Sequence, residues 1–215
     1  MPAPVFRRRR LPHWDAPNST FFITSCLANS IPATGRLDIA AFEERMARQP
    51  TPMQFSIHEW KARRESRLFI RHDDWLDLRP ARRWLEDPRL AALISNAIRH
   101  FDGHRYDLLA YVVMPSHVHW VFRPRAEWFA REIRPDDQRS PREIILHSVQ
   151  TFTAVAGNRL LRRSGVFWQR ESYDRCVRDE RELERVVAYI EHNPVKAGLV
   201  KRAEDWRFSS ASTRV

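Results

Sequence analysis

The stretch YDLLAYVVMPSHVHWVFRP, residues 106–124, consists of two apolar runs separated by Pro115 and Ser116. Proline has no backbone N–H to contribute to a β-ladder, so this dipeptide interrupts the interior of a strand. The two runs are therefore predicted to form the strands of a β-hairpin. A hairpin implies an antiparallel sheet, and the patterns on either side of it indicate how that sheet is covered.

Amphipathic helices are predicted before and after the hairpin. Residues 90–101 place apolar side chains at helical spacing, and the Asp102–Gly103 turn follows. A second, long helix is expected to begin after Ser140, because Glu143 follows at the spacing of a capping box. Both helices have an apolar face that can cover a sheet.

A third helix is predicted over residues 180–193, with Asp179 as its N-cap. We expect it to extend no further, because Pro194 disfavours helical backbone in the residue before it. Strands are expected at 21–28, which is rich in β-branched and aromatic residues, and within 166–177.

The predicted order is therefore strand, helix, hairpin, helix, strand, helix. This order favours an α+β fold, a mainly antiparallel sheet with helices packed on it, over a doubly wound one. With 215 residues, the chain is expected to form one domain, residues 1–215. We interpret residues 1–20 as a basic arm and about 43–90, with the charged pieces FEERMARQ and ARRWLEDP, as a helical insertion.

The charge balance points to a polyanionic partner. The chain has 37 Lys and Arg against 27 Asp and Glu, a formal net charge of +10. Nucleic acid is the leading partner, and a basic protein without a polyanionic partner is the alternative. Arg7, Arg8, Arg9 and Arg10 form a run that either contacts a DNA backbone or is simply solvated.

Cysteine use and hydropathy predict a cytoplasmic protein. Cys26 and Cys176 are the only cysteines and lie far apart, which argues against a disulfide framework and a thiolate metal site. No apolar segment approaches the length of a membrane span, and arginines stand where a signal peptide needs an apolar run. We therefore expect no membrane partner.

The hairpin also carries the candidate chemistry. Successive strand residues point to opposite faces, so His117 and His119 project together, away from Val118 and Trp120. Two imidazoles placed in this way can bind one divalent cation if a third oxygen or nitrogen ligand arrives from elsewhere. The alternative is a pair of partly exposed histidines without a ligand.

The last predicted helix offers two further groups. Tyr189 and Asn193 are four residues apart, so they share one face of that helix. A tyrosine phenol is a possible nucleophile, and an amide oxygen is a possible ligand of a hard metal. The alternative for Tyr189 is an ordinary residue at the boundary between the polar and apolar faces.

Four motifs, MPSHVHWVF, GVFWQRESYDR, YIEHNPVKAGLV and DWRFSSA, occur in this order, and RRLPHW and FFITSCLA precede them. Together they resemble the REP-associated tyrosine transposases, relatives of the single-tyrosine HUH transposases. The resemblance implies a ferredoxin-like core and a metal-dependent single-strand DNA endonuclease and strand transferase that acts on hairpin DNA. It also implies that His117 and His119 bind Mg²⁺ or Mn²⁺, that Asn193 is the third ligand and that Tyr189 is the nucleophile.

Two alternatives to this enzyme stay open. The chain could be a non-catalytic protein that binds DNA hairpins and derives from a transposase, or a nuclease directed at RNA. The resemblance allows either a monomer or a homodimer. It also contains a departure, since Ser116 stands where these transposases usually have asparagine before the first histidine.

Overall fold

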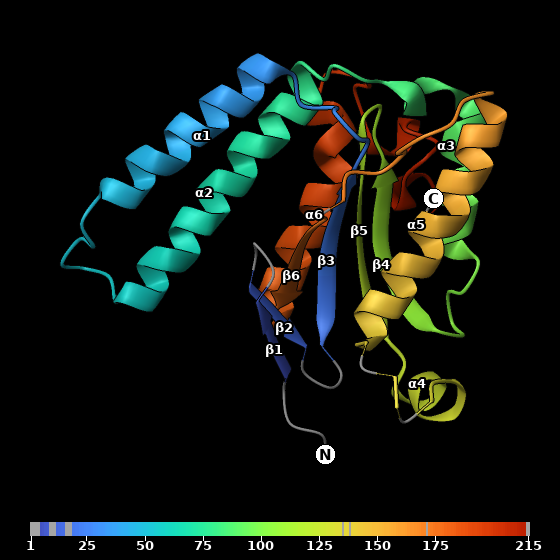
Figure 1. The fold of residues 1–215 in the computed structure, drawn as a ribbon, viewed down its shortest axis with the longest axis horizontal. Coiled ribbons are helices and arrows are strands. Elements are labelled where there is room, and N and C mark those ends of the chain that lie inside the picture. The colour runs from blue at the N-terminus through green and yellow to red at the C-terminus, as the bar shows by residue number, and fades with distance from the viewer. Residues whose placement is uncertain are drawn as a thin grey trace. The chain divides into compact units, whose positions relative to one another are not determined.

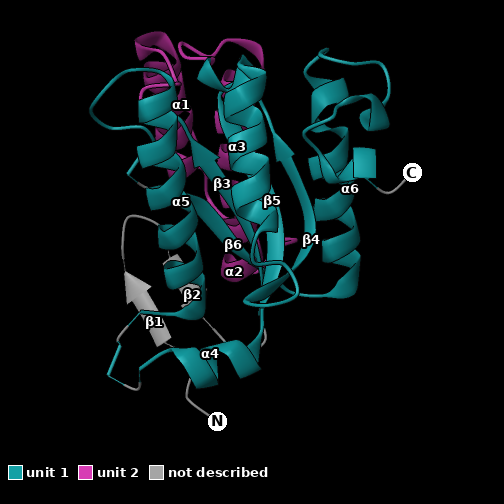
Figure 2. Cartoon of the chain, turned by 90° about the vertical axis from the view of Figure 1, so that its right-hand side faces the viewer, with its two compact units in different colours: residues 1–28, 84–215 teal, residues 29–83 magenta. Residues whose placement is uncertain are grey.

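The computed structural model describes the backbone of residues 5–8 and 12–15, and residues 19–134, 136–137, 139–170 and 172–213 with their side chains (Figure 1). The chain divides into two compact units, residues 1–28 with 84–215, and residues 29–83 (Figure 2). The organisation as one domain with a basic arm and an insertion at about 43–90 stays a prediction.

The first unit contains a four-stranded antiparallel sheet with the strand order β4-β5-β3-β6 (Figure 1). The strands are β3 (Thr20–Cys26), β4 (Tyr106–Val113), β5 (His117–Pro124) and β6 (Tyr173–Val177). Strand β5 pairs with both β4 and β3. The predicted hairpin is thus confirmed, and the strand that carries the two histidines lies in the interior of the sheet.

Helices cover both faces of this sheet (Figure 2). The helices of the first unit are α3 (Pro88–Arg99), α4 (Ala126–Glu132), α5 (Pro141–Leu160) and α6 (Glu180–Lys196). Helices α3 and α5 pack together on one face, whereas α6 packs on the other face against β4 and β5. This arrangement and strand order confirm the predicted α+β, ferredoxin-like fold.

The main core lies between the sheet and the α3–α5 layer. Val118, Trp120 and Phe122 on β5 belong to it, together with Phe21 and Ile23 on β3. Each of these side chains is at most 4% exposed. The alternation predicted for β5 is therefore present, with the apolar side chains on the face covered by α3 and α5.

The helix starts follow the predicted caps. Ser140 accepts a hydrogen bond from the backbone N–H of Glu143, and the Glu143 carboxylate accepts one from the backbone N–H of Ser140. Asp179 caps α6 by accepting from the backbone N–H of Glu182 at 2.8 Å. These local contacts confirm the starts of α5 and α6.

The predicted end of α6 at Asn193 is wrong, because the helix continues through Pro194 to Lys196. Proline removes one N–H donor but leaves its carbonyl free to accept, and Leu199 donates to Pro194 at 2.9 Å. The N–H of Ala197 donates to the carbonyl of Asn193, also at 2.9 Å. Asn193 and Pro194 are buried, so packing holds this last turn in place.

Two other predicted elements are shorter than expected. The strand predicted within 166–177 forms a regular strand only from Tyr173, as β6. In the charged piece ARRWLEDP, Trp84–Glu86 form a turn of 3-10 helix, and only Pro88 is α-helical, as the first residue of α3. Further 3-10 turns lie at Ala203–Asp205 and Ser210–Thr213.

The second unit is a helical hairpin of α1 (Ala33–Arg48) and α2 (Ile57–Leu78). Asp38 on α1 joins the two helices, because it accepts hydrogen bonds from Arg71 and Trp75 on α2 at 2.7 and 2.8 Å. A Cβ at Gly35 would lie 2.8 Å from the Trp75 ring, so glycine allows the close approach of the helices.

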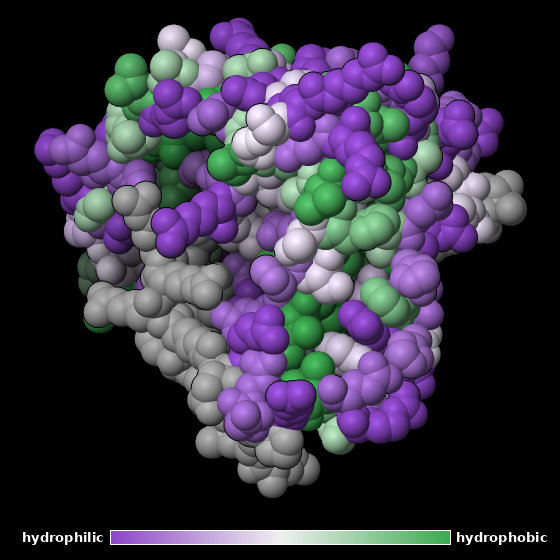
Figure 3. Space-filling view, turned by 45° about the vertical axis from the view of Figure 1, so that its right-hand side comes forward, coloured by the Kyte–Doolittle hydropathy of each residue, from purple (hydrophilic) through white to green (hydrophobic). Residues whose placement is uncertain are grey.

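Hydrophilic residues cover much of the face drawn in Figure 3, with smaller apolar patches between them. Phe152 and Val155 on α5 are exposed apolar residues, at 56% and 60%. Among the described residues, no helix combines the length and the apolar composition needed to cross a membrane.

Candidate active site

The two histidines of β5 converge on the face of the sheet that is opposite the main core. Their Nε2 atoms are 3.0 Å apart, and their ring centroids are 4.5 Å apart. Both side chains are fully buried, at 0% exposure, so the alternative of partly exposed histidines does not describe this pair. Two nitrogen atoms of neutral imidazoles at this distance can hold one shared proton or one cation between them.

Hydroxyl groups lie at the other nitrogen of each ring. Thr24 Oγ1 is 2.8 Å from His119 Nδ1, and Ser116 Oγ is 3.0 Å from His117 Nδ1. Thr24 is the partner of His119 in the register between β3 and β5. Sequence reasoning did not identify Thr24, because the register of two strands so distant in the chain is fixed only by the tertiary fold.

The two Nε2 atoms are close enough to bind the same metal ion. A nitrogen ligand lies about 2.1 Å from a divalent cation, so two nitrogen atoms 3.0 Å apart can both reach one ion. His117 and His119 therefore fit a divalent cation such as the one expected from the resemblance.

Helix α6 brings Tyr189 to this face of the sheet. The centroid of the Tyr189 ring is 5.5 Å from that of His119 and 6.1 Å from that of Phe22. Val186 and Ile190 are buried on the same helix and fix its rotation, so that the intervening Tyr189 faces the sheet. The structure thus places the candidate nucleophile beside a candidate metal ligand.

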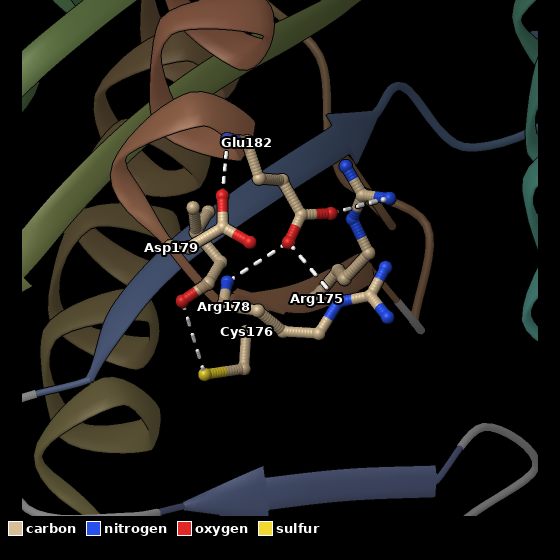
Figure 4. A network of polar contacts seen from close by, with 6 residues as sticks. Arg175, Cys176, Arg178, Asp179 and Glu182 are labelled. Carbon is tan, nitrogen blue, oxygen red and sulfur yellow. Dashed lines mark hydrogen bonds and ion pairs between the residues drawn. The ribbon is translucent and has the colours of Figure 1, made fainter.

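The start of α6 is held by a polar network around Glu182, which Figure 4 shows. The Glu182 carboxylate accepts from the backbone N–H and the Nε of Arg178, at 2.9 and 3.2 Å, and lies 3.2 Å from an Arg175 nitrogen. Burial raises the pKa of Glu182, but these hydrogen bonds and positive charges outweigh burial, and the net pKa is lowered. The network ties α6 to β6 and so fixes where Tyr189 lies.

Asn193 is one turn beyond Tyr189 on α6. It is 1% exposed, and neither its Oδ1 nor its Nδ2 has a hydrogen-bond partner among the described residues. A buried amide without partners costs about 1 to 3 kcal/mol. This amide therefore opposes folding, which fits a group kept for a ligand and suits the third-ligand role expected for it.

Lys196 is a basic residue near the candidate nucleophile that sequence reasoning missed. Its Nζ lies 6.0 Å from the centroid of the Tyr189 ring. Tyr189, Asn193 and Lys196 follow one another at spacings of four and three, so they share a stripe of α6. Since α6 was expected to end before Pro194, this third member of the stripe lay outside the predicted helix.

The other tyrosines differ in their surroundings. Tyr106 donates its hydroxyl hydrogen to the carbonyl of Ile98, and burial raises its pKa, which disfavours a phenolate there. Tyr111 is buried and accepts a hydrogen bond from Ser95 at 3.0 Å. Tyr173 begins β6, and its ring lies 6.4 Å from that of Phe22, which the Tyr189 ring also contacts. Tyr173 is therefore the alternative candidate for the nucleophile.

The predicted DNA contacts of the arm cannot be placed in the same way. The backbone of Val5–Arg8 forms β1 and pairs with β2 (Pro12–Asp15). The side chains of Arg7 and Arg8, and all of Arg9 and Arg10, lie outside the described residues. Their contact with DNA stays a prediction.

Two buried carboxylates were also missed by sequence reasoning. Asp73 and Asp77 lie one turn apart on α2 of the second unit and are 1% and 8% exposed. No local pattern distinguishes them from the other charged residues of this helix, which carry both signs.

No protein-family model matches the chain. The chain is 28% identical over 147 residues to the REP-associated tyrosine transposase of Escherichia coli (strain K12), which covers 67% of this chain and 79% of that protein. It is 27% identical over 111 residues to a candidate REP-associated tyrosine transposase of Haemophilus influenzae, which covers 51% of this chain and 61% of that protein.

A solved structure is similar in fold. It is that of a REP-associated tyrosine transposase bound to a REP hairpin, and the superposition has a TM-score of 0.51 and 18% identity, covering 91% of this chain and 78% of that chain. The resemblance predicted from the motifs is therefore confirmed: in sequence and in fold, this chain is similar to the REP-associated tyrosine transposases.

Proposed function

We propose that the chain is a metal-dependent single-strand DNA endonuclease and strand transferase that acts on hairpin DNA. The observation that supports this most directly is the convergence of three groups on one face of the sheet. The Nε2 atoms of His117 and His119 are 3.0 Å apart, and the Tyr189 ring lies beside His119.

In this proposal Tyr189 is the nucleophile. Its phenolate oxygen attacks the scissile phosphorus, a bond from that oxygen to phosphorus forms, and the bond from phosphorus to the 3′ oxygen breaks. The products are a 5′-phosphotyrosine and a 3′-hydroxyl, which takes up one proton. Because the phosphotyrosine is itself a phosphodiester, another 3′-hydroxyl can reverse the step and join a different strand.

His117, His119 and Asn193 are proposed to hold the divalent cation, Mg²⁺ or Mn²⁺. When bound, such a cation polarises the phosphodiester and stabilises the charge that develops in the transition state. Lys196 adds a positive charge on the Tyr189 side of the site, where a phosphate group has to approach.

The proposed substrate is single-stranded or hairpin DNA in the cytoplasm. One solved relative is bound to a REP hairpin, and the net charge of +10 favours a polyanion. Arg7 to Arg10 are proposed to contact the DNA backbone. The enzyme is expected to act as a monomer or a homodimer and without a membrane.

A labelled hairpin oligonucleotide with a single-stranded foot, incubated with Mn²⁺, tests the proposal. We expect a covalent protein–DNA adduct that survives denaturation, is lost in Tyr189→Phe and persists in Tyr173→Phe. His119→Ala and a chelator should each prevent it. An adduct that is lost only in Tyr173→Phe would move the nucleophile to β6.

The same assay separates the alternatives. Hairpin binding that is unchanged by a chelator, with no adduct under any divalent metal, would identify a non-catalytic DNA-binding protein. Cleavage that improves when 2′-hydroxyls are present in the substrate would instead indicate a nuclease directed at RNA.

A further inference from the structure

We infer that Thr24 and Ser116 are positioning residues that direct the Nε2 atoms of His119 and His117 toward one cation. The inference rests on the proposed function, since it concerns the same site. It goes beyond that function by naming which groups hold the two imidazoles in the orientation and the tautomer that bind the cation.

Whether an imidazole nitrogen can bind a metal depends on where the ring carries its proton. A neutral ring carries its proton on one nitrogen and a lone pair on the other, and only the lone pair can bind a metal. Nε2 is therefore a ligand only when the proton is on Nδ1. A hydrogen-bond acceptor at Nδ1 favours that tautomer and also fixes the orientation of the ring.

Each ring has a hydroxyl group next to its Nδ1 that can serve as such an acceptor. Thr24 Oγ1 lies 2.8 Å from His119 Nδ1, and Ser116 Oγ lies 3.0 Å from His117 Nδ1. Thr24 and Ser116 are 2% and 0% exposed. Because water cannot readily replace a hydroxyl group at so buried a position, each contact depends on the side chain itself.

The two hydroxyl groups reach the site by different routes. Ser116 belongs to the turn between β4 and β5 and directly precedes His117, so its contact is local. Thr24 lies on β3 and meets His119 through strand pairing. Ring orientation at His119 thus depends on the register of the sheet, whereas that at His117 depends on the hairpin turn.

The position of Ser116 also gives a reason for the departure from the transposase pattern. The Ser116 hydroxyl oxygen lies 3.0 Å from His117 Nδ1 and can accept a hydrogen bond from it. An acceptor oxygen is the feature that serine shares with asparagine, so the substitution keeps this contact.

The first experiment needs no activity. The side-chain ¹⁵N chemical shifts of His117 and His119, measured by NMR near pH 8 with saturating Mg²⁺, report which ring nitrogen carries the proton. We expect both rings of the Mg²⁺-bound wild-type protein as the Nδ1–H tautomer. A Mg²⁺-bound wild-type His119 with its proton on Nε2 overturns the inference by itself, whatever the behaviour of the variants.

The second experiment measures Mn²⁺ affinity by calorimetry. Thr24→Val removes the hydroxyl at nearly constant shape and keeps a β-branched residue in the strand, and Thr24→Ser keeps the hydroxyl. We expect Thr24→Val and Ser116→Ala to weaken Mn²⁺ binding about 10- to 100-fold, and Thr24→Ser to stay close to the wild type. Thr24→Val should also move His119 toward the Nε2–H tautomer.

Ser25→Ala is the matched control. Ser25 is the neighbour of Thr24, is also buried, and accepts from Gln150 at 3.1 Å. Losing its hydroxyl should leave Mn²⁺ affinity and both tautomers unchanged. Equal Mn²⁺ affinity in the wild type and Thr24→Val overturns the inference alone, whereas a wild type that binds no Mn²⁺ overturns the proposed function as well.

Discussion

The ring of Tyr189 on α6 lies 5.5 Å from the ring of His119 on β5, measured between centroids. Helix α6 reaches this position by packing on β4 and β5, on the face opposite the main core. The packing of a helix, rather than any local motif, thus brings the candidate nucleophile to the candidate metal ligands.

Tyr189→Phe is expected to abolish the covalent adduct while leaving the stability and the Mn²⁺ affinity of the protein nearly unchanged. The substitution removes only the hydroxyl, so the edge-to-face contact with Phe22 remains. Stability should change by less than about 1 kcal/mol, and Mn²⁺ affinity by less than about twofold, while the covalent adduct is lost. Calorimetry and thermal unfolding check the first two expectations. A large loss of Mn²⁺ affinity would show that the hydroxyl helps to hold the metal.

Asn193→Leu is expected to stabilise the protein and to weaken metal binding. The Asn193 amide is buried without a partner among the described residues, so a side chain of similar shape without polar atoms avoids that cost. We expect about 1 kcal/mol of added stability in urea unfolding, with Mn²⁺ affinity reduced at least tenfold. Lower stability combined with unchanged affinity would contradict the third-ligand role.

Glu182→Gln is expected to destabilise the protein and to reduce its sensitivity to acid. The pKa of Glu182 is lower in the folded state than its ordinary value of 4.5. The ionised carboxylate therefore stabilises the fold above pH 4.5, and this stabilisation is lost as the pH falls through the pKa of the folded state. Losing the charged contacts with Arg178 and Arg175 should cost about 1 to 3 kcal/mol at pH 7. Urea unfolding at pH 7 and near pH 3 checks this, and the difference between wild type and variant should shrink at the lower pH.

Arg142 on α5 and Asp174 on β6 form a buried ion pair, with side chains 6% and 2% exposed. Asp174→Asn leaves the Arg142 guanidinium buried without its counter-charge, which is expected to cost about 3 to 5 kcal/mol. Replacing both residues with leucine should recover most of that loss. Urea unfolding of the two variants checks the pair, and a double variant as unstable as Asp174→Asn would contradict this account.

Lys196→Ala is expected to weaken DNA binding without unfolding the protein, because Lys196 is exposed. If it contacts a phosphate, the slope of log affinity against log salt should fall by about one, and Lys196→Arg should retain the wild-type slope. Fluorescence anisotropy with the hairpin at several salt concentrations measures both slopes. A slope that is unchanged in Lys196→Ala would remove the residue from the DNA contact.

The local elements could be predicted from the sequence because their signals are local. Pro115 and Ser116 interrupt the two strands of the hairpin, and Ser140 and Asp179 cap the helices that follow them. A cap or a turn depends on backbone groups a few residues away, so its residues identify it without knowledge of the rest of the fold. The sequence motifs indicated the resemblance to a family. The strand order and the similarity in fold to a solved structure agree with that resemblance.

The amino-acid sequence by itself determined the hairpin, the helix starts and the shared face of His117 and His119, because these follow from the periods of helix and strand. The tertiary structure decided that Thr24 meets His119, that the Tyr189 ring lies beside the same imidazole, and that α6 continues through Pro194. Each of these results depends on packing between segments that are distant in the chain. The free energy of this packing outweighs local backbone preferences, such as the tendency of a residue before proline to avoid helical backbone.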